Sequence, residues 1–290
     1  LSDRIATFLE NHEYAYGLSH DINSIAPNDV VEWIGVKPEI LVGGAPCQGF
    51  SSIRPFRTLS ENDQRNNLFL AYSRYLEHLK PDWFVFENVV GLLTHKGGRT
   101  LNTLLDEFGA SGYRVSFRVM NSAFYGVPQL RERLVVVGNK HGIDFSWPDP
   151  SHYFPYKSMA GNNNPALLRP ENKENCLSAV TVMDALDDLP ELMPGQSASF
   201  YVRDNELSPY QNYLREGSSK LTWHTASTHS QKMMRIIEAS GYNINSVRHL
   251  VSSGFSSSYS RLEPDRPSVT MTVNFVHPSS NKCIHPIQNR

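Results

Sequence analysis

The chain has 290 residues, a formal net charge of −2 and 40% hydrophobic residues; this is enough apolar material for a buried core and excludes wholesale disorder. The near-neutral charge neither supports nor excludes a phosphate-rich partner. The three cysteines are widely spaced, which argues against a disulfide framework or a zinc cluster and favours a reducing, cytoplasmic setting. No apolar run approaches the roughly 20 residues that span a bilayer.

The first half of the chain alternates short apolar runs with helical patterns, as a doubly wound α/β sheet does. Residues 39–44 predict a short buried strand and residues 82–89 a second one. Between them, residues 66–80 predict an amphipathic helix with its apolar face formed by Leu68, Tyr72, Tyr75 and Leu79. A strand, a helix and a strand in this order form a right-handed crossover, so the two strands should be parallel.

The remaining predicted elements are a helix over 99–113, strands over 113–121 and 133–139, and short helices over 181–190 and 225–241. The last helix has Thr225 or Ser227 as its expected N-cap and Gly241 as its stop. Beyond residue 142 the chain becomes rich in Pro and Asn, which is typical of irregular surface structure. We therefore expect a boundary near residues 145–150.

Reactive side chains are expected to meet at one edge of the predicted sheet. Cys47 follows the end of the first strand, and Glu87 lies at the end of the next, 40 residues later; because parallel strands end at the same edge, both should project there. If strand 133–139 runs antiparallel, Arg131 and Arg133 reach the same edge. A thiolate nucleophile, a proton-sharing carboxyl group and a guanidinium that binds a ring carbonyl together suit addition to a pyrimidine.

Three motifs in this order, "PCQGFS", "FENV" and "QLRER", resemble the signatures of the cytosine-C5 DNA methyltransferases. The resemblance covers nearly all of the chain, and "HDI", "RNNLF", "YSRLEPDRPSVTMT" and "HPIQNR" extend it. It implies a mostly parallel sheet of the S-adenosylmethionine-dependent type with a smaller target-recognition domain. The expected division is a catalytic domain over 1–145, a target-recognition region over 146–260 and a return segment over 261–290.

The resemblance also implies a role for each matching residue. Cys47 would attack C6 of a flipped-out cytosine, Glu87 would engage N3 and the exocyclic amine, and Arg133 would contact O2 with support from Arg131. The residues implied in binding S-adenosyl-L-methionine are Asp21, Ile22, Pro46 and Leu68. Those implied in binding double-stranded DNA are Gln48, Ser51, Gln129 and Arg261. We expect no metal and no membrane, and a prokaryotic cytoplasm as the location.

The chain departs from the family pattern at both ends. It has no glycine-rich turn of the form "DLFAGxGG", and it stops before the last family motif. The resemblance therefore implies an incomplete chain, with a complementary N-terminal piece as a possible partner. A restriction-modification methylase is the favoured function; the alternatives are a tRNA cytosine-C5 methyltransferase of the same fold and a catalytically silent DNA-binding or regulatory subunit.

Ordinary structural roles compete with several of these interpretations. Asp21 could be a simple N-cap, and Arg131 and Arg133 could form a surface ion-pair network with Glu132. Cys176 and Cys283 are expected to be packing residues. Within the recognition region, the candidate base readers have suitable polar side chains: Arg203, Asn205, Gln211, Asn212 and Arg215.

Overall fold

The computed structural model describes residues 2–45, 68–202 and 206–290. Four predicted site residues, Pro46, Cys47, Gln48 and Ser51, lie outside these ranges. The chain forms two compact units: the first comprises 1–119, 133–147 and 159–167, and the second 120–132, 148–158 and 168–290. The division into 1–145, 146–260 and 261–290 stays a prediction.

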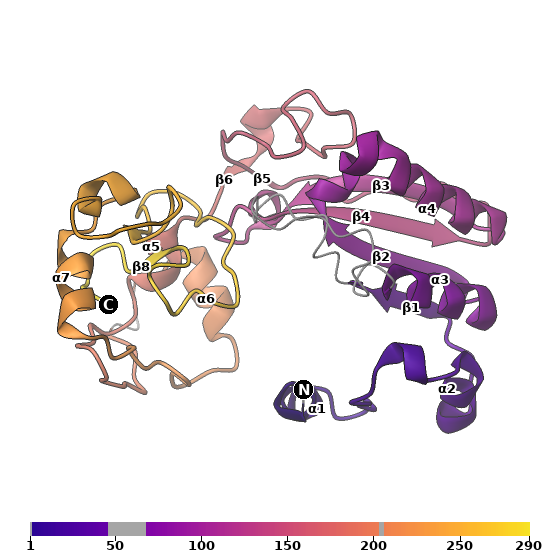
Figure 1. Cartoon of the computed structure of the whole chain (residues 1–290), viewed down its shortest axis with the longest axis horizontal. Helices are drawn as coiled ribbons and strands as arrows, with labels where there is room; N and C mark the ends of the chain where they lie inside the picture. Colours follow the sequence, from indigo (N-terminus) through magenta and orange to yellow (C-terminus); the bar gives the residue numbers. More distant parts are fainter. Residues whose placement is uncertain (1, 46–67, 203–205) are drawn as a thin grey trace. The chain divides into compact units, whose positions relative to one another are not determined.

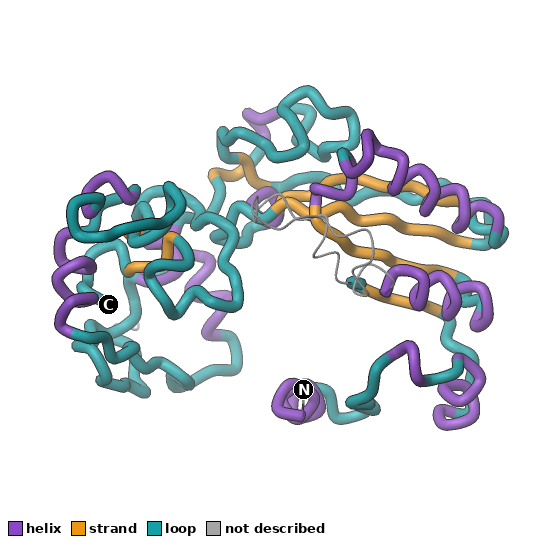
Figure 2. The backbone as a smooth tube through the Cα atoms, viewed as in Figure 1, coloured by secondary structure: helices purple, strands orange, loops and turns teal. Residues whose placement is uncertain are grey.

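The first unit is built on a four-stranded sheet with the strand order β1-β2-β4-β3 (Figures 1 and 2). Its strands are β1 (Ile40–Gly43), β2 (Trp83–Val89), β3 (Arg114–Asn121) and β4 (Glu132–Asn139), and the last two extend into the second unit. As predicted, β1 and β2 are parallel, and β4 runs antiparallel to β2. The α/β fold class is confirmed.

Helices α3 (Leu68–Leu79) and α4 (Arg99–Ala110) cover one face of this sheet. The predicted apolar face of α3 is confirmed, because Tyr72, Tyr75 and Leu79 are buried and Leu68 is half-buried. The core contains aromatic and aliphatic side chains from both layers: Tyr72 and Leu76 from α3, Phe84 and Phe86 from β2, Leu101, Leu104 and Phe108 from α4, and Leu134 and Val136 from β4. Dense packing of this kind holds the strand ends in fixed register.

Three further helical segments of the first unit precede the sheet. They are α1 (Ser2–Asn11), the 3₁₀ turn η1 (Ile22–Ser24) and α2 (Pro27–Ile34). Arg74 on α3 donates to the carbonyl oxygen of Ile22 at 2.9 Å, and Tyr75 donates to that of Ile25 at 2.9 Å. These two bonds fasten the η1 segment to the crossover helix.

The second unit contains short elements joined by long irregular segments. Its strands pair in parallel as β5 (His152–Tyr153) with β6 (Leu177–Ser178) and β7 (Ser260–Arg261) with β8 (Lys282–Ile284). Its helices are α5 (Val182–Leu186), α6 (Pro209–Arg215) and α7 (Gln231–Ala239). The 3₁₀ turns of the two units after α3 are η4 (Val90–Leu93), η5 (His95–Gly98), η6 (Ser122–Tyr125), η7 (Lys173–Asn175) and η8 (Ile244–Val247).

The predicted N-cap of the last helix is wrong. Helix α7 begins at Gln231, and the hydroxyl oxygen of Ser230 accepts from the backbone N–H of Met233 at 3.3 Å. Thr225 instead pairs with Ser197, with 2.8 Å between their hydroxyl oxygens. Several Ser and Thr residues precede the helix, and only the one directly before the first turn can reach its free N–H groups.

Candidate active site

Glu87 and Arg133 form an ion pair where β2 ends and the antiparallel strand β4 begins. Strand β2 buries Phe84 and Phe86 against the helices, so Glu87 projects from the opposite face. Glu87 pairs in register with Val135 and Arg133 with Val89, which makes the two charged residues diagonal neighbours on that face. Arg133 Nε lies 2.8 Å from Glu87 Oε1, and the side chains are 21% and 44% exposed. The pair is therefore held by the sheet and accessible to a ligand.

The two glycines at the end of β1 make room for this arrangement. A Cβ on Gly43 would lie 2.5 Å from the Tyr72 ring, and one on Gly44 would lie 3.1 Å from Glu87 Oε2. The Tyr72 hydroxyl donates to the carbonyl oxygens of Leu41 and Val85 at 3.3 and 3.1 Å. Burial raises the pKa of Tyr72 well above its ordinary value, so the hydroxyl stays a donor. Small residues let β1 approach both the helix and the glutamate.

Asn88 ties the ends of these two strands together. Its side chain is 3% exposed, its Nδ2 donates to the carbonyl oxygen of Ala45 at 3.1 Å, and its Oδ1 accepts from the backbone N–H of Val89 at 2.8 Å. Ala45 is two residues before the predicted nucleophile Cys47. Sequence reasoning missed this residue, although its place in "FENV" directly after the glutamate was an available signal.

The segment before β4 is held from the protein interior. The backbone N–H of Arg131 donates to Asn121 Oδ1 at 3.2 Å, and the Arg131 carbonyl oxygen accepts from the N–H of Ser122 at 3.1 Å. Glu132 is 6% exposed and accepts a hydrogen bond from the Tyr156 hydroxyl. This carboxylate is buried, so it does not have the surface position that the ion-pair alternative assumed; whether it pairs with an arginine stays a prediction.

The predicted cofactor residues that fall within the described ranges lie in the first unit. Asp21 caps the η1 turn: its Oδ1 accepts from the backbone N–H of Asn23 at 2.9 Å and from the Asn23 amide at 3.0 Å. Ile22 is 39% exposed, and Leu68 begins α3. Asp21 therefore has the capping role considered for it, and its neighbour Ile22 offers exposed apolar surface.

Two predicted DNA-binding residues make extensive contacts within the second unit. The Gln129 carbonyl oxygen accepts from the Ser122 hydroxyl at 2.6 Å, and its backbone pairs with Ser268. The Arg261 guanidinium directs all its N–H groups at acceptors in the chain: the carbonyl oxygens of Ile237, Ser240, His285 and Gln288, and the Asn289 side chain. A DNA contact by Arg261 would have to replace one of these bonds.

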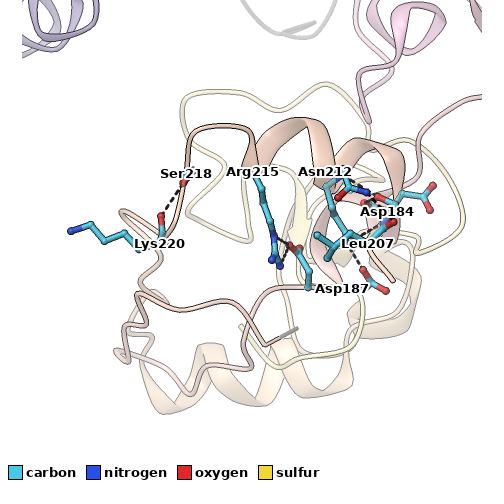
Figure 3. Close-up of polar contacts among 10 residues, drawn as sticks. Asp184, Asp187, Leu207, Asn212, Arg215, Ser218 and Lys220 are labelled. Atoms are coloured by element: carbon cyan, nitrogen blue, oxygen red, sulfur yellow. Dashed lines mark hydrogen bonds and ion pairs between the residues drawn. The ribbon is translucent and has the colours of Figure 1, made fainter. Parts of the chain in front are cut away.

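The candidate base readers on α6 are likewise engaged (Figure 3). Arg215 donates to Asp188 Oδ2 from Nε and Nη2, at 2.9 and 2.6 Å, and lies over the Tyr201 ring. Gln211 is 1% exposed and donates to Asp187 Oδ1. Asn212 reaches the Leu207 carbonyl oxygen at 3.4 Å. These residues stabilise the local fold; Arg203 and Asn205 lie outside the described residues.

Within residues 2–45, 68–202 and 206–290, no helix has both the length and the apolar character needed to cross a membrane. Over the same part of the chain, His, Cys, Asp and Glu side chains do not gather into a group of three able to hold a metal ion.

The fold has a counterpart among solved protein structures. A crystal structure of a candidate DNA modification methyltransferase encoded within an E. coli prophage superimposes with a TM-score of 0.65 at 20% sequence identity, covering 99% of this chain and 75% of that one. The sequence profile of the C-5 cytosine-specific DNA methylases matches residues 2–282. The chain therefore belongs to the C-5 cytosine-specific DNA methylase family, as its motifs predicted.

Its relatives include bacterial modification enzymes. The type II methyltransferase M.AgeI of Thalassovita gelatinovora is 34% identical over 229 residues, which cover 77% of this chain and 52% of that protein. The type II methyltransferase M1.HphI of Haemophilus parahaemolyticus is 29% identical over 278 residues, covering 94% of this chain and 61% of that protein. The chain thus spans between half and two thirds of the length of these relatives.

Proposed function

We propose that this chain carries the catalytic centre of a restriction-modification DNA methyltransferase that methylates C5 of a cytosine within a specific duplex sequence. The Glu87–Arg133 ion pair at the sheet edge carries this proposal. It presents a carboxylate and a guanidinium side by side, and the Asn88 bond to Ala45 ties that edge to the chain leading to Cys47. Family membership and type II relatives support the same activity.

In the proposed reaction, the target cytosine leaves the helix, which costs a few kcal/mol. The Cys47 thiolate forms a bond to C6 while Glu87 engages N3 and the exocyclic amine, and Arg133 donates to O2. The electron pair of the C5–C6 double bond then makes C5 nucleophilic. After methylation, a base removes the C5 proton, the double bond re-forms and the Cys47 thiolate leaves.

The residues of the η1 segment fit the adenosine part of S-adenosyl-L-methionine. Both hydrogen bonds of the Asp21 carboxylate use Oδ1, so among the described residues Oδ2 stays available as an acceptor for a hydroxyl or amine. Ile22 offers exposed apolar surface beside it. Asp21, Ile22, Pro46 and Leu68 would hold the cofactor, which supplies an electrophilic methyl group when bound.

The test is methyl transfer from labelled S-adenosyl-L-methionine, measured with the full-length protein. Duplex DNA containing many sequences and bulk tRNA are offered in parallel, and Glu87→Gln is compared with Glu107→Gln, which changes an exposed carboxylate on α4. We expect label in duplex DNA, lost in Glu87→Gln and retained in Glu107→Gln. Label in tRNA alone, or equal activity of the two variants, would overturn the proposal, and so would a protein that binds DNA without methylating it.

A further inference from the structure

The arginine motif has a buried anchor in its middle. Glu132 separates Arg131 from Arg133 and is 6% exposed, whereas both arginines are half-buried. Side chains alternate along a strand, so Glu132 points into the protein while its neighbours point away from it. A buried carboxylate is costly unless it is hydrogen-bonded, and the Tyr156 hydroxyl supplies such a bond.

Tyr156 is itself firmly placed. Its ring packs edge-on against Phe124, with 5.7 Å between ring centroids, and Phe124 is fully buried in η6. Burial raises the pKa of Tyr156 above its ordinary value; the Glu132 carboxylate acts in the same direction, and side-chain hydrogen bonds with Asn121 and Ser158 act against it. The hydroxyl therefore remains protonated and donates to Glu132.

The same short segment is also held through its backbone. Asn121 is fully buried, and its Oδ1 accepts from the N–H groups of both Arg131 and Ala123, at 3.2 and 3.1 Å. The Arg131 carbonyl oxygen accepts from Ser122. The backbone of Arg131 and the side chain of its neighbour Glu132 are thus fixed by three separate bonds, and a guanidinium on a long flexible side chain gains orientation from a rigid base.

We propose that Tyr156 is a positioning residue for the arginine motif: by donating to Glu132, its hydroxyl holds Arg131 in the orientation that supports the target base and its DNA backbone. This inference rests on the proposed function. It assigns a role to a residue that comes from the irregular segment after β5, outside the motifs that define the site.

The chain contains a matched control in Tyr153. Its ring also packs on Phe124, stacked at 5.8 Å between centroids, and its hydroxyl has no hydrogen bond among the described residues. Tyr153→Phe and Tyr156→Phe therefore remove the same atom beside the same aromatic ring, and only the second breaks the bond to Glu132.

The experiment measures the single-turnover rate of methyl transfer to duplex DNA by the full-length protein, together with its melting temperature. Because a hydrogen bond to a charged group is strong, Tyr156→Phe should slow transfer about tenfold and Tyr153→Phe less than about twofold. If Tyr156 acts through Arg131, the two effects are not additive, and in an Arg131→Lys background Tyr156→Phe should cost less than about threefold. The cofactor KM should not change.

Equal slowing by the two tyrosine variants would overturn the inference, as would a tenfold loss that persists in Arg131→Lys, because that is the behaviour of a residue that supports only packing. If Tyr156→Phe does not fold, Glu132→Gln takes its place; it keeps an oxygen acceptor without the charge and should slow transfer by about threefold or more. If the wild-type protein is active and the variants transfer the methyl group at the wild-type rate, the positioning role alone is refuted. If the wild-type protein is inactive, the proposed function is refuted.

Discussion

Asn88→Ala should disconnect the ends of β1 and β2 and slow methyl transfer. The substitution removes the donor to Ala45 at 3.1 Å and the acceptor of the Val89 N–H at 2.8 Å, in a side chain that is 3% exposed. Each buried group left unsatisfied costs about 1–3 kcal/mol. If the chain before Cys47 is misplaced and about 1.4 kcal/mol of this cost is added to the activation free energy of methyl transfer, the rate falls about tenfold.

Asn139→Ala is the matched control, because Asn139 is also a buried asparagine of the same sheet. It is 1% exposed, its Nδ2 donates to Ile143 at 2.8 Å, and its Oδ1 accepts from the backbone N–H groups of His141 and Ile143, each at 3.0 Å. It pairs in register with Trp83, at the far end of β2 from Glu87.

The assay combines urea unfolding with single-turnover kinetics of the folded protein and DNA titration. Both asparagine variants should lose about 2 kcal/mol of unfolding free energy, but only Asn88→Ala should lose about tenfold in rate, with little change in DNA affinity. Equal rates for the two variants would show that the tether to Ala45 has no part in catalysis.

Three other predictions concern single positions. Gly44→Ala places a Cβ 3.1 Å from Glu87 Oε2 and should mainly lower the methylation rate. Gly43→Ala places a Cβ 2.5 Å from the Tyr72 ring and should mainly lower the unfolding free energy, by about 1–3 kcal/mol. A larger loss of rate in Gly43→Ala and a larger loss of unfolding free energy in Gly44→Ala would contradict the packing described. Burial, followed by neighbouring cations, lowers the pKa of His285 from 6.5 to about 4. Its Nδ1 accepts two backbone N–H groups. Between these pH values the imidazole is protonated in the unfolded chain and neutral in the native state. The free energy of unfolding should therefore fall as the pH drops from about 6.5 to 4, by about 2 kcal/mol after solvent screening. An unchanged dependence of the unfolding free energy on pH in His285→Gln would refute this. Ser230→Ala should cost about 1 kcal/mol through its lost cap, while Ser227→Ala should leave thermal unfolding unchanged.

The sequence located the sheet edge because the relevant signals are local. Apolar runs, the amphipathic face of α3 and the length of one crossover predicted that Glu87 stands near the end of a strand parallel to β1, and this is confirmed. The antiparallel course of β4, stated as a condition for bringing Arg133 to that edge, is also confirmed. Topology alone then accounts for the Glu87–Arg133 pair.

Side-chain partnerships between distant segments were not readable in this way. Arg215 had the chemistry of a base reader, but its carboxylate partner Asp188 is 27 positions away, and no spacing rule predicts that pair. Tyr156 reaches Glu132 across 24 positions. Arg261 was a plausible DNA contact until the carbonyl groups around it were known. Polar residues of the same type can therefore have different roles, because their hydrogen-bond acceptors are brought close only by the tertiary structure.

The most direct test of the central claim uses a duplex in which the target cytosine carries fluorine at C5. Fluorine cannot leave as the C5 proton does, so the adduct should accumulate after methylation. We expect a denaturation-resistant complex that requires S-adenosyl-L-methionine, maps to Cys47 and is absent from Cys47→Ser. A full-length protein that binds this duplex and the cofactor but forms no such complex, or forms it on another residue, would contradict the account.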